Sequence, residues 1–187
     1  MVAHAISARR KGAERLRRSV SVTTRPRRAD EEEGRDYFFV APEEFQRLVA
    51  AGQLLEWATY LDHSYGTPRE WVDRQLLGGY DVVLEIEVKG AMQVKERRPG
   101  AVLIYMLPPS WEALRRRLAR RRSESPELQQ RRLEVARQEM SVLDSYDYVI
   151  ANDRVGHAAH LLLCILEAER SRVLRTDLTA LREVISD

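Results

Sequence analysis

Strand and helix signals alternate along this chain of 187 residues, and the alternation restricts its fold more than any other feature. Apolar runs of buried-strand length occupy residues 81–86 and 101–107, and a helical pattern over about 88–97 separates them. A chain that switches repeatedly between strand and helix patterns is typical of layered domains in which helices cover a sheet. The sequence therefore predicts an α/β fold.

The remaining elements follow from the same signals. We expect further strands over 37–40, 54–60 and 148–150, and helices over 42–51, 68–77, 110–120, 126–143 and 156–174. Proline opens the helix at Pro42, Gly52 ends it, and a Gly-Gly pair closes the next helix. Beyond the helix over 156–174, an amphipathic helix over about 174–187 is expected to pack on this domain or on a partner. Its apolar residues at helical spacing are Leu174, Leu178, Leu181 and Ile185.

Composition places the chain among globular proteins. Hydrophobic residues make up 44%, which suffices for a core, and the length fits a single domain over 1–187. The 31 Lys and Arg nearly balance 29 Asp and Glu, so a preference for anions must come from local clusters. The apolar runs 101–107 and 161–166 are too short to cross a bilayer, and the N-terminus has no apolar signal core. We expect a cytoplasmic protein without a membrane partner, in which Cys164, the sole cysteine, is buried.

Hydroxyls and guanidiniums gather between residues 19 and 67. Arg25 and Arg28 can each present a planar donor fork to phosphate oxygens. The hydroxyls that complete this donor set are those of Ser21, Tyr37 and Tyr65. Further along, the Glu56 carboxylate can accept two parallel hydrogen bonds from the N1–H and 2-amino edge of guanine, which adenine does not offer. This pattern predicts a phosphate pocket with a guanine-selecting carboxylate some distance away.

Two other charged groups stand out. Six arginines crowd residues 115–122, and alone they indicate a nucleic-acid patch or a solvated helical face. Helical spacing places Arg117 and Arg121 on one side, one turn apart, with Arg132 facing them from the next helix. Glu85 and Glu87 alternate along a predicted strand, so they point the same way at the end where α/β folds bind ligands. The acidic run 30–33 is expected to be a solvated loop.

In order and spacing, these pieces resemble the guanylate kinase family, which moves the terminal phosphoryl group of ATP onto GMP. The resemblance covers roughly 19–170. It continues through Val-Val-Leu-Glu-Ile-Glu-Val-Lys-Gly-Ala (82–91), Leu-Pro-Pro-Ser (107–110), Gln-Arg-Arg-Leu (130–133) and Asp-Tyr-Val-Ile-Ala-Asn-Asp (147–153). It implies a P-loop kinase-type, three-layer parallel core over about 1–20 and 80–175. A mixed α+β GMP-binding subdomain over about 21–79 and a helical lid over about 117–126 would complete the domain.

The resemblance also implies roles for individual residues and a requirement for Mg²⁺ with ATP. Tyr65 would send its phenol to the GMP phosphate, and Thr67 and Glu87 would join Glu56 at the guanine. The lid arginines that close over the ATP phosphates would be Arg117, Arg121 and Arg132. Asn152 would meet the adenine of ATP, and Glu85 would lie near the metal, where contact through water is compatible with its longer reach. No nucleic-acid partner is expected, and the oligomeric state is left open.

The chain departs from the family at its N-terminus. It contains no Gly-rich phosphate loop ending in Gly-Lys-Ser/Thr, and residues 1–18 resemble the remainder of the helix that should follow such a loop. Either the chain is a truncated kinase, or it is a noncatalytic GMP-binding or protein-binding module. We favour truncation, because the donor-site residues are retained and because the missing first strand would leave unpaired backbone groups at the centre of a parallel sheet. The chain as given is then expected to be catalytically impaired.

Overall fold

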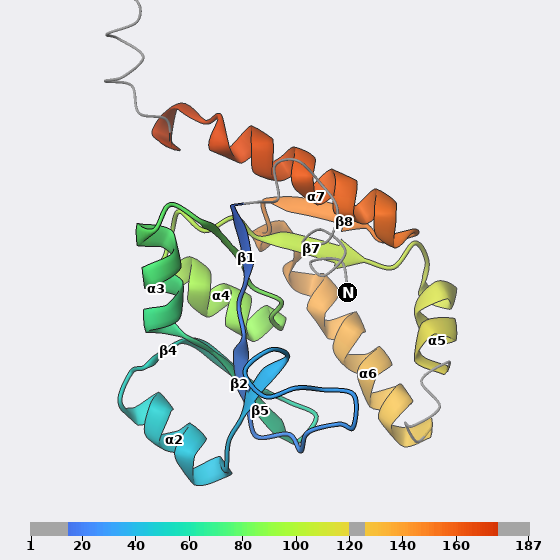
Figure 1. Cartoon of the computed structure of the whole chain (residues 1–187). Coiled ribbons are helices and arrows are strands. Elements are labelled where there is room, and N and C mark those ends of the chain that lie inside the picture. The colour runs from blue at the N-terminus through green and yellow to red at the C-terminus, as the bar shows by residue number, and fades with distance from the viewer. Residues whose placement is uncertain (1–14, 120–125, 176–187) are drawn as a thin grey trace, which may run out of the picture.

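The computed structural model describes residues 15–119 and 126–175, in which a core of strands and helices carries a smaller sheet at one end (Figure 1). Two parallel strand pairs make the core: β1 (Leu16–Arg18) with β6 (Asp81–Val83), and β7 (Ile104–Leu107) with β8 (Tyr148–Ala151). Helix α4 (Val88–Arg97) connects β6 to β7, and α7 (Val155–Arg170) follows β8. The core thus alternates strand and helix, as the sequence predicts.

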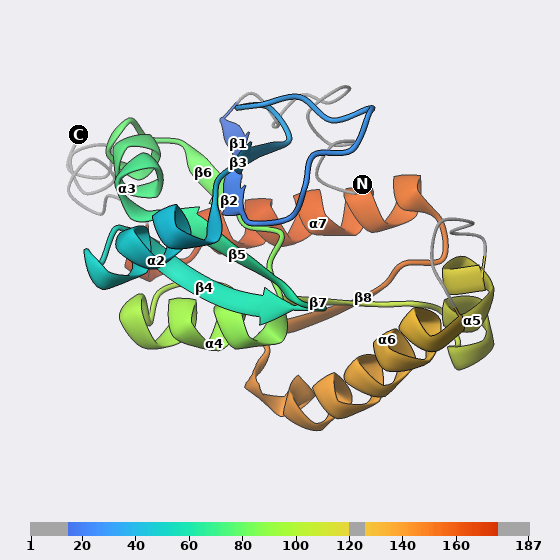
Figure 2. The ribbon, with the colours of Figure 1, turned by 90° about the horizontal axis from the view of Figure 1, so that it is seen from below.

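Helices α4 and α7 cover opposite faces of the core strands (Figure 2). Successive side chains of a strand point to opposite faces, and β6 shows the result. Val82 packs in a cluster with Val94 of α4, whereas Val83 packs in a cluster with Leu162 of α7. The order helix, strand, helix confirms the predicted three-layer α/β core.

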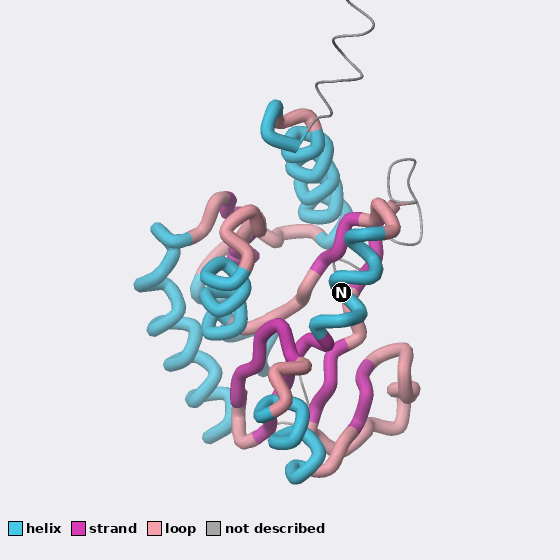
Figure 3. The backbone as a smooth tube through the Cα atoms, turned by 90° about the vertical axis from the view of Figure 1, so that its left-hand side faces the viewer, coloured by secondary structure: helices cyan, strands magenta, loops and turns pink. Residues whose placement is uncertain are grey.

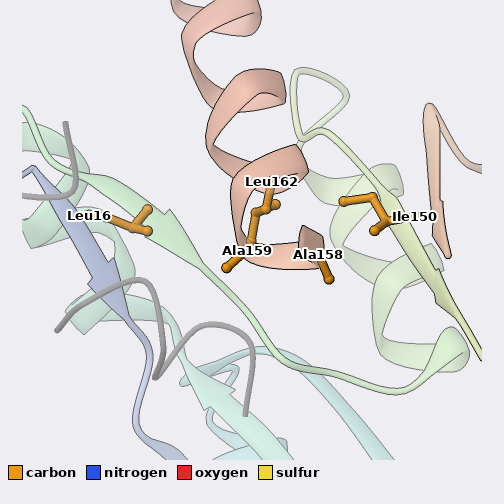
Figure 4. Packing of buried hydrophobic residues seen from close by; sticks show 5 residues of the cluster. All are labelled: Leu16, Ile150, Ala158, Ala159 and Leu162. Atoms are coloured by element: carbon orange, nitrogen blue, oxygen red, sulfur yellow. The ribbon is translucent and has the colours of Figure 1, made fainter. Parts of the chain in front are cut away.

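Strand β1 corrects the prediction that residues up to Arg18 continue a helix. Leu16 is only 5% exposed and belongs to the cluster that α7 shares with Ile150 of β8 (Figure 4). Pairing with β6 and burial of Leu16 outweigh the helical preference of this arginine-rich segment, because propensity yields to tertiary contacts. Residues 1–14, the rest of that predicted helix, lie outside the described part of the chain.

A four-stranded mixed sheet, here called the small sheet, lies at the end of the molecule away from α7 (Figure 3). Its strands, in spatial order, are β3 (Tyr37–Phe39), β2 (Ser21–Thr23), β5 (His63–Pro68) and β4 (Leu54–Tyr60). Strand β2 runs parallel to β3 and antiparallel to β5. Helices α2 (Pro42–Ala50) and α3 (Arg69–Leu77) accompany the sheet, and the fully buried Phe45 of α2 packs on Val22 and Leu54.

Helix α6 (Pro126–Glu139) joins the core to the small sheet. It follows α5 (Trp111–Ala119) and leads through the 3₁₀ segment η1 (Met140–Ser145) to β8. The turn between β4 and β5 consists of Leu61 and Asp62, both with positive φ, as the tightest hairpin turns require. Arg131 of α6 donates to this Asp62 carboxylate at 3.2 Å, so the hairpin tip is tied to α6.

Several boundaries differ from those predicted. Strand β6 ends at Val83 instead of residue 86, because its partner β1 ends at Arg18 and a ladder cannot outlast its partner. Strand β7 begins at Ile104, where pairing with Tyr148 begins. Strands β2 and β5 were not predicted, because Ser, Thr, His and Gly dominate them and leave no apolar alternation.

The C-terminal part of the chain also differs. Helix α7 ends at Arg170 and a 3₁₀ turn, η2 (Val173–Arg175), follows it. Leu174, the first apolar residue of the predicted tail helix, is 90% exposed, and residues 176–187 are beyond the range that the structure describes. The prediction for Cys164 is wrong, since its side chain is exposed, with Sγ 3.6 Å from Nε2 of His160. Within the described ranges, no helix is long and apolar enough to cross a membrane.

Candidate functional site

The small sheet brings together the side chains predicted to hold a phosphate. Strand β2 lies between β3 and β5, so Tyr37 and Tyr65 flank the segment that carries Arg25. The two tyrosine rings are 6.0 Å apart in an edge-on arrangement, and the Arg25 guanidinium lies 5.4 Å from the centre of the Tyr37 ring. Ser21 pairs directly with Tyr37 across the ladder. These four residues converge on one end of the small sheet.

Glu31 belongs to this cluster, although the sequence indicated a solvated loop. Its carboxylate accepts a hydrogen bond from Nη2 of Arg25 at 2.5 Å and from the backbone N–H of Arg28 at 2.8 Å. The Arg25 and Glu31 side chains are only 13% and 12% exposed. Burial disfavours the charge on Arg25, but the Glu31 carboxylate and a hydrogen bond with Tyr65 outweigh it and raise the arginine's pKa. An acidic residue six positions after Arg25 carries no periodic signal, so sequence reasoning missed it.

Arg28 takes a more open position than Arg25. Its side chain is exposed, and its positive charge helps to lower the pKa of Glu31 against the opposing effect of burial. One buried arginine and one exposed arginine therefore stand on the two sides of a single carboxylate. An anion that enters here meets a fixed donor in Arg25 and an adjustable one in Arg28.

Glu56 and Thr67 form a buried polar pair on neighbouring strands. Glu56 of β4 is 3% exposed, Thr67 of β5 is fully buried, and the threonine hydroxyl donates to Oε1 of Glu56 at 2.6 Å. Burial raises the pKa of Glu56, while hydrogen bonds from Thr67 and the charge of Arg97 lower it. Oε2 lies against Gly90 of α4, where a Cβ would overlap it. The sequence prediction that these two residues share a site agrees with this contact.

Glu87 stands at the point where β6 leads into α4. It is the N-cap residue of α4, and burial together with repulsion from Glu139 raises its pKa from 4.5 to about 7. The Glu139 carboxylate of α6 accepts the backbone N–H of Val88, and burial raises its pKa as well. Arg132 of the same helix partly offsets the repulsion at Glu87. Glu139 was not predicted from the sequence, because nothing in its local pattern distinguishes it from a solvated helical glutamate.

Glu85 and Glu87 do not share an environment, contrary to the prediction that they point the same way. The strand ends before them, and the Glu85 side chain is 41% exposed with its carboxylate 3.6 Å from Nη1 of Arg18. Among the residues that the structure describes, no group of three or more acidic, His or Cys side chains could hold a metal ion.

The predicted lid arginines lie in different places. Arg117 of α5 donates to the backbone carbonyls of Asn152 and Asp153, just after β8. Arg132 donates to the Tyr60 hydroxyl at 3.3 Å and lies over its ring, so α6 reaches the small sheet here too. Arg121 falls within 120–125, which the structure does not describe.

Asn152 follows strand β8 at the carboxyl end of the core. Its backbone N–H donates to the carbonyl of Leu107 at 2.6 Å. Its side-chain oxygen Oδ1 is buried and accepts no hydrogen bond from the described residues. A buried oxygen usually accepts at least one hydrogen bond, so Oδ1 is a candidate acceptor for a donor on a ligand.

Comparisons with known proteins fit this arrangement. The family model described as "Guanylate kinase" matches residues 8–169. The chain belongs to the guanylate kinase family. It is 49% identical over 154 residues to a guanylate kinase of Oceanobacillus iheyensis, a match that covers 82% of this chain and 75% of that protein. It is 47% identical over 157 residues to one of Streptococcus agalactiae, covering 84% and 75%.

A solved guanylate kinase from Anaplasma phagocytophilum has the same fold. Its TM-score is 0.80 at 36% identity, and the match covers 98% of this chain and 87% of that one. Membership of the guanylate kinase family makes the chain a phosphotransferase, and it confirms the family and fold that the sequence motifs indicated. The roles of the individual site residues remain predictions.

Proposed function

We propose that this chain binds GMP as the acceptor of the terminal phosphoryl group of ATP, a transfer that yields ADP and GDP in cytoplasmic purine metabolism. The observation that carries the proposal is the buried Glu56–Thr67 pair beside an arginine and tyrosine cluster on the same small sheet. A buried carboxylate needs partners. A guanine edge with two parallel N–H donors supplies them, and an adenine edge does not.

In the proposed base site, the Glu56 carboxylate accepts hydrogen bonds both from Thr67 and from the guanine. The Thr67 hydroxyl donates to Oε1 of Glu56 and the Thr67 backbone N–H also donates to this carboxylate, which leaves its remaining lone pairs for guanine. The Thr67 oxygen keeps acceptor capacity of its own. Glu56 lies close enough for its charge to help raise the pKa of Glu87, so Glu87 completes the acidic end of the pocket. Binding of the N1–H and 2-amino donors favours the ionised form of Glu56.

The phosphate of GMP would occupy the other end of the small sheet. Arg25 is held in its charged form and in a fixed direction by Glu31, so its orientation is set before the ligand arrives. Tyr37 and Tyr65 offer hydroxyl donors from the flanking strands, with Ser21 beside them. Arg28 would add a second positive charge to the phosphate from the solvent-exposed side of the site. This division between base and phosphate ends fits one nucleoside monophosphate.

On the donor side, we assign ATP to the carboxyl ends of the core strands. Asn152 Oδ1, which is buried and accepts no hydrogen bond from the described residues, would accept one from the 6-amino group of adenine. Arg117, Arg121 and Arg132 would neutralise charge that develops on the transferred phosphoryl group. Glu85 fits an outer-sphere contact to Mg²⁺, which is normally held by one or two carboxylates together with substrate phosphates and water. When bound, Mg²⁺ would neutralise phosphate charge and orient the leaving group.

Isothermal calorimetry with GMP and AMP tests the acceptor site directly. Wild-type protein should prefer GMP, and Glu56→Gln should lose most of the preference, because one charge-assisted hydrogen bond is worth about 1.5 to 3 kcal/mol, or roughly ten- to a hundred-fold in affinity. Arg25→Ala should weaken GMP binding by a similar factor. Arg27→Ala is the matched control, since Arg27 is exposed on the same loop. Equal affinities of the wild type for GMP and AMP would contradict the assignment of Glu56.

A noncatalytic GMP-binding module is the alternative, and no Gly-Lys-Ser/Thr phosphate loop occurs among the 187 residues. Coupled ADP release from ATP and GMP distinguishes the two. The 187-residue chain should turn over little, because each transition-state contact of a phosphate loop is worth roughly 3 to 4 kcal/mol. A version extended at its N-terminus by an apolar strand and such a loop should recover activity. Failure to recover with GMP binding intact would favour the noncatalytic module.

A further inference from the structure

Helix α4 packs against β4, the edge strand of the small sheet (Figure 2). An edge strand has backbone N–H and C=O groups that point away from its neighbour and need other partners. Gly90, Gln93 and Arg97 lie one turn apart on the same side of α4, and all three contact β4. The residues of β4 that they contact are Leu55, Glu56 and Trp57. The contact is therefore centred on the carboxylate of the proposed base site.

Gln93 takes the place of a neighbouring strand at one position of β4. Its Oε1 accepts a hydrogen bond from the Trp57 N–H at 3.2 Å, and its Nε2 donates to the Trp57 carbonyl at 2.6 Å. One side-chain amide thus makes both hydrogen bonds that a residue of an adjacent antiparallel strand would make. Because Trp57 follows Glu56 directly, this pair of bonds fixes the backbone on the C-terminal side of Glu56.

Arg97 holds the backbone on the other side of Glu56. The register of β4 with β5 shifts between Leu54 and Glu56, which leaves Leu55 as the extra residue of a β-bulge. A shift of one residue moves side chains to the opposite face of a sheet, so the bulge decides on which face the Glu56 carboxylate lies. The Arg97 guanidinium donates to the Leu55 carbonyl within this bulge. Burial raises the pKa of Glu56, and the charge of Arg97 partly offsets this effect.

We propose that Gln93 and Arg97 are positioning residues for base selection, which hold the bulged edge of β4 so that the Glu56 carboxylate meets guanine. Neither side chain touches the nucleotide, and each acts through the backbone on one side of Glu56. The inference rests on the proposed GMP site and adds the residues that give its acid a fixed direction. Because α4 also begins at Glu87, a single helix aligns both acids of the base site. A binding group must be held within about 0.5 Å of its productive position, so loss of this support should reduce selectivity.

Calorimetry with three ligands tests the proposal: GMP, IMP, which lacks the 2-amino group, and ribose 5-phosphate, which lacks the base. Gln93→Met keeps the length of the side chain and removes both hydrogen bonds to Trp57. It should lower GMP affinity about tenfold and the preference for GMP over IMP about fivefold, because a displaced carboxylate loses its bond to the 2-amino group. The affinity for ribose 5-phosphate should stay unchanged, since the phosphate cluster lies at the other end of the small sheet. Glu96→Gln is the matched control, because Glu96 is exposed on the same helix.

A second pair of variants and a structural readout test the two contacts separately. Arg97→Met should reduce the preference for GMP over IMP, and Arg97→Lys should reduce it less, because lysine retains a cation that can donate to the Leu55 carbonyl. Amide exchange measured by NMR should accelerate at Trp57 in Gln93→Met and stay unchanged in α2, because only the edge of β4 is released.

Two results would overturn the inference. One is a wild-type preference for GMP over IMP in both Gln93→Met and Arg97→Met. The other is an equal loss of affinity for GMP and ribose 5-phosphate, which would indicate a general loss of structure instead of a misplaced carboxylate. Either result leaves the proposed function intact as long as the wild type prefers GMP to AMP. A wild type without that preference refutes the proposed function, and this inference with it.

Discussion

Replacing Glu87 with Gln should change how the stability of the protein depends on pH. Burial and the neighbouring Glu139 raise the pKa of Glu87 from 4.5 to about 7. A carboxyl group whose pKa is higher in the folded state binds its proton more tightly there. Its favourable contribution is complete below pH 4.5 and is lost as the pH rises through about 7.

The size of this loss follows from the pKa difference. At about 1.4 kcal/mol for each pH unit, the difference corresponds to about 3 kcal/mol, and partial access of water reduces it to about 2 to 3 kcal/mol. Glu87→Gln cannot ionise and avoids the loss. The free energy of unfolding of the variant, relative to wild type, should therefore rise by that amount between pH 4.5 and pH 8.

Urea denaturation followed by circular dichroism at several pH values measures this difference. Other titrating groups are shared by both proteins and largely cancel in the comparison. Glu85→Gln is the matched control, because it removes a carboxylate two residues away whose side chain is exposed. A constant difference between wild type and Glu87→Gln across this pH range would refute the claim that Glu87 is buried beside Glu139.

Three further predictions concern single side chains. Gly90→Ala should lower GMP affinity about tenfold or more, despite a gain in helix propensity of about 1 kcal/mol, because its methyl group would displace the Glu56 carboxylate; calorimetry checks this. Phe45→Ala should cost about 3 to 5 kcal/mol in urea denaturation, because the ring is completely buried; a cost below about 1 kcal/mol would contradict that packing. Asp147→Ala should cost about 1 to 2 kcal/mol, since its carboxylate accepts the Leu103 N–H at 2.7 Å, and Asp144→Ala provides the comparison.

Elements were predicted correctly from the sequence where the local pattern agrees with the tertiary environment. Strand β4 and helix α4 occupy the residues predicted for them, since their apolar residues are the ones that the fold buries. The sequence assigned Glu56 and Thr67 to one base site, and in the structure the two side chains are in contact. These are positions where local preference and the fold agree.

Other features depend on contacts that no local pattern encodes. Leu16 is in a strand because of β6, which lies more than sixty residues later in the chain. Glu31 is drawn out of solvent by Arg25, and Glu139 by the first turn of α4, although both look like ordinary surface acids in sequence. Glu85 and Glu87 separate because the ladder ends before them, an outcome that depends on the length of β1. Each miss reflects a partner distant along the chain.

The small sheet and its helices are inserted between two strands that are neighbours in the core. The insertion begins and ends at nearly the same point: Arg15 donates to the carbonyl of Gly79 at 3.1 and 2.8 Å, and the Ser19 N–H donates to the carbonyl of Val83 at 3.0 Å. Before β1 can pair with β6, the whole intervening loop must close, and non-local pairing of this kind slows folding. If the small sheet and its helices fold first, they bring β1 and β6 together. The rate at which the core assembles therefore depends partly on the stability of the small sheet, and mutations there can slow folding without changing a core residue.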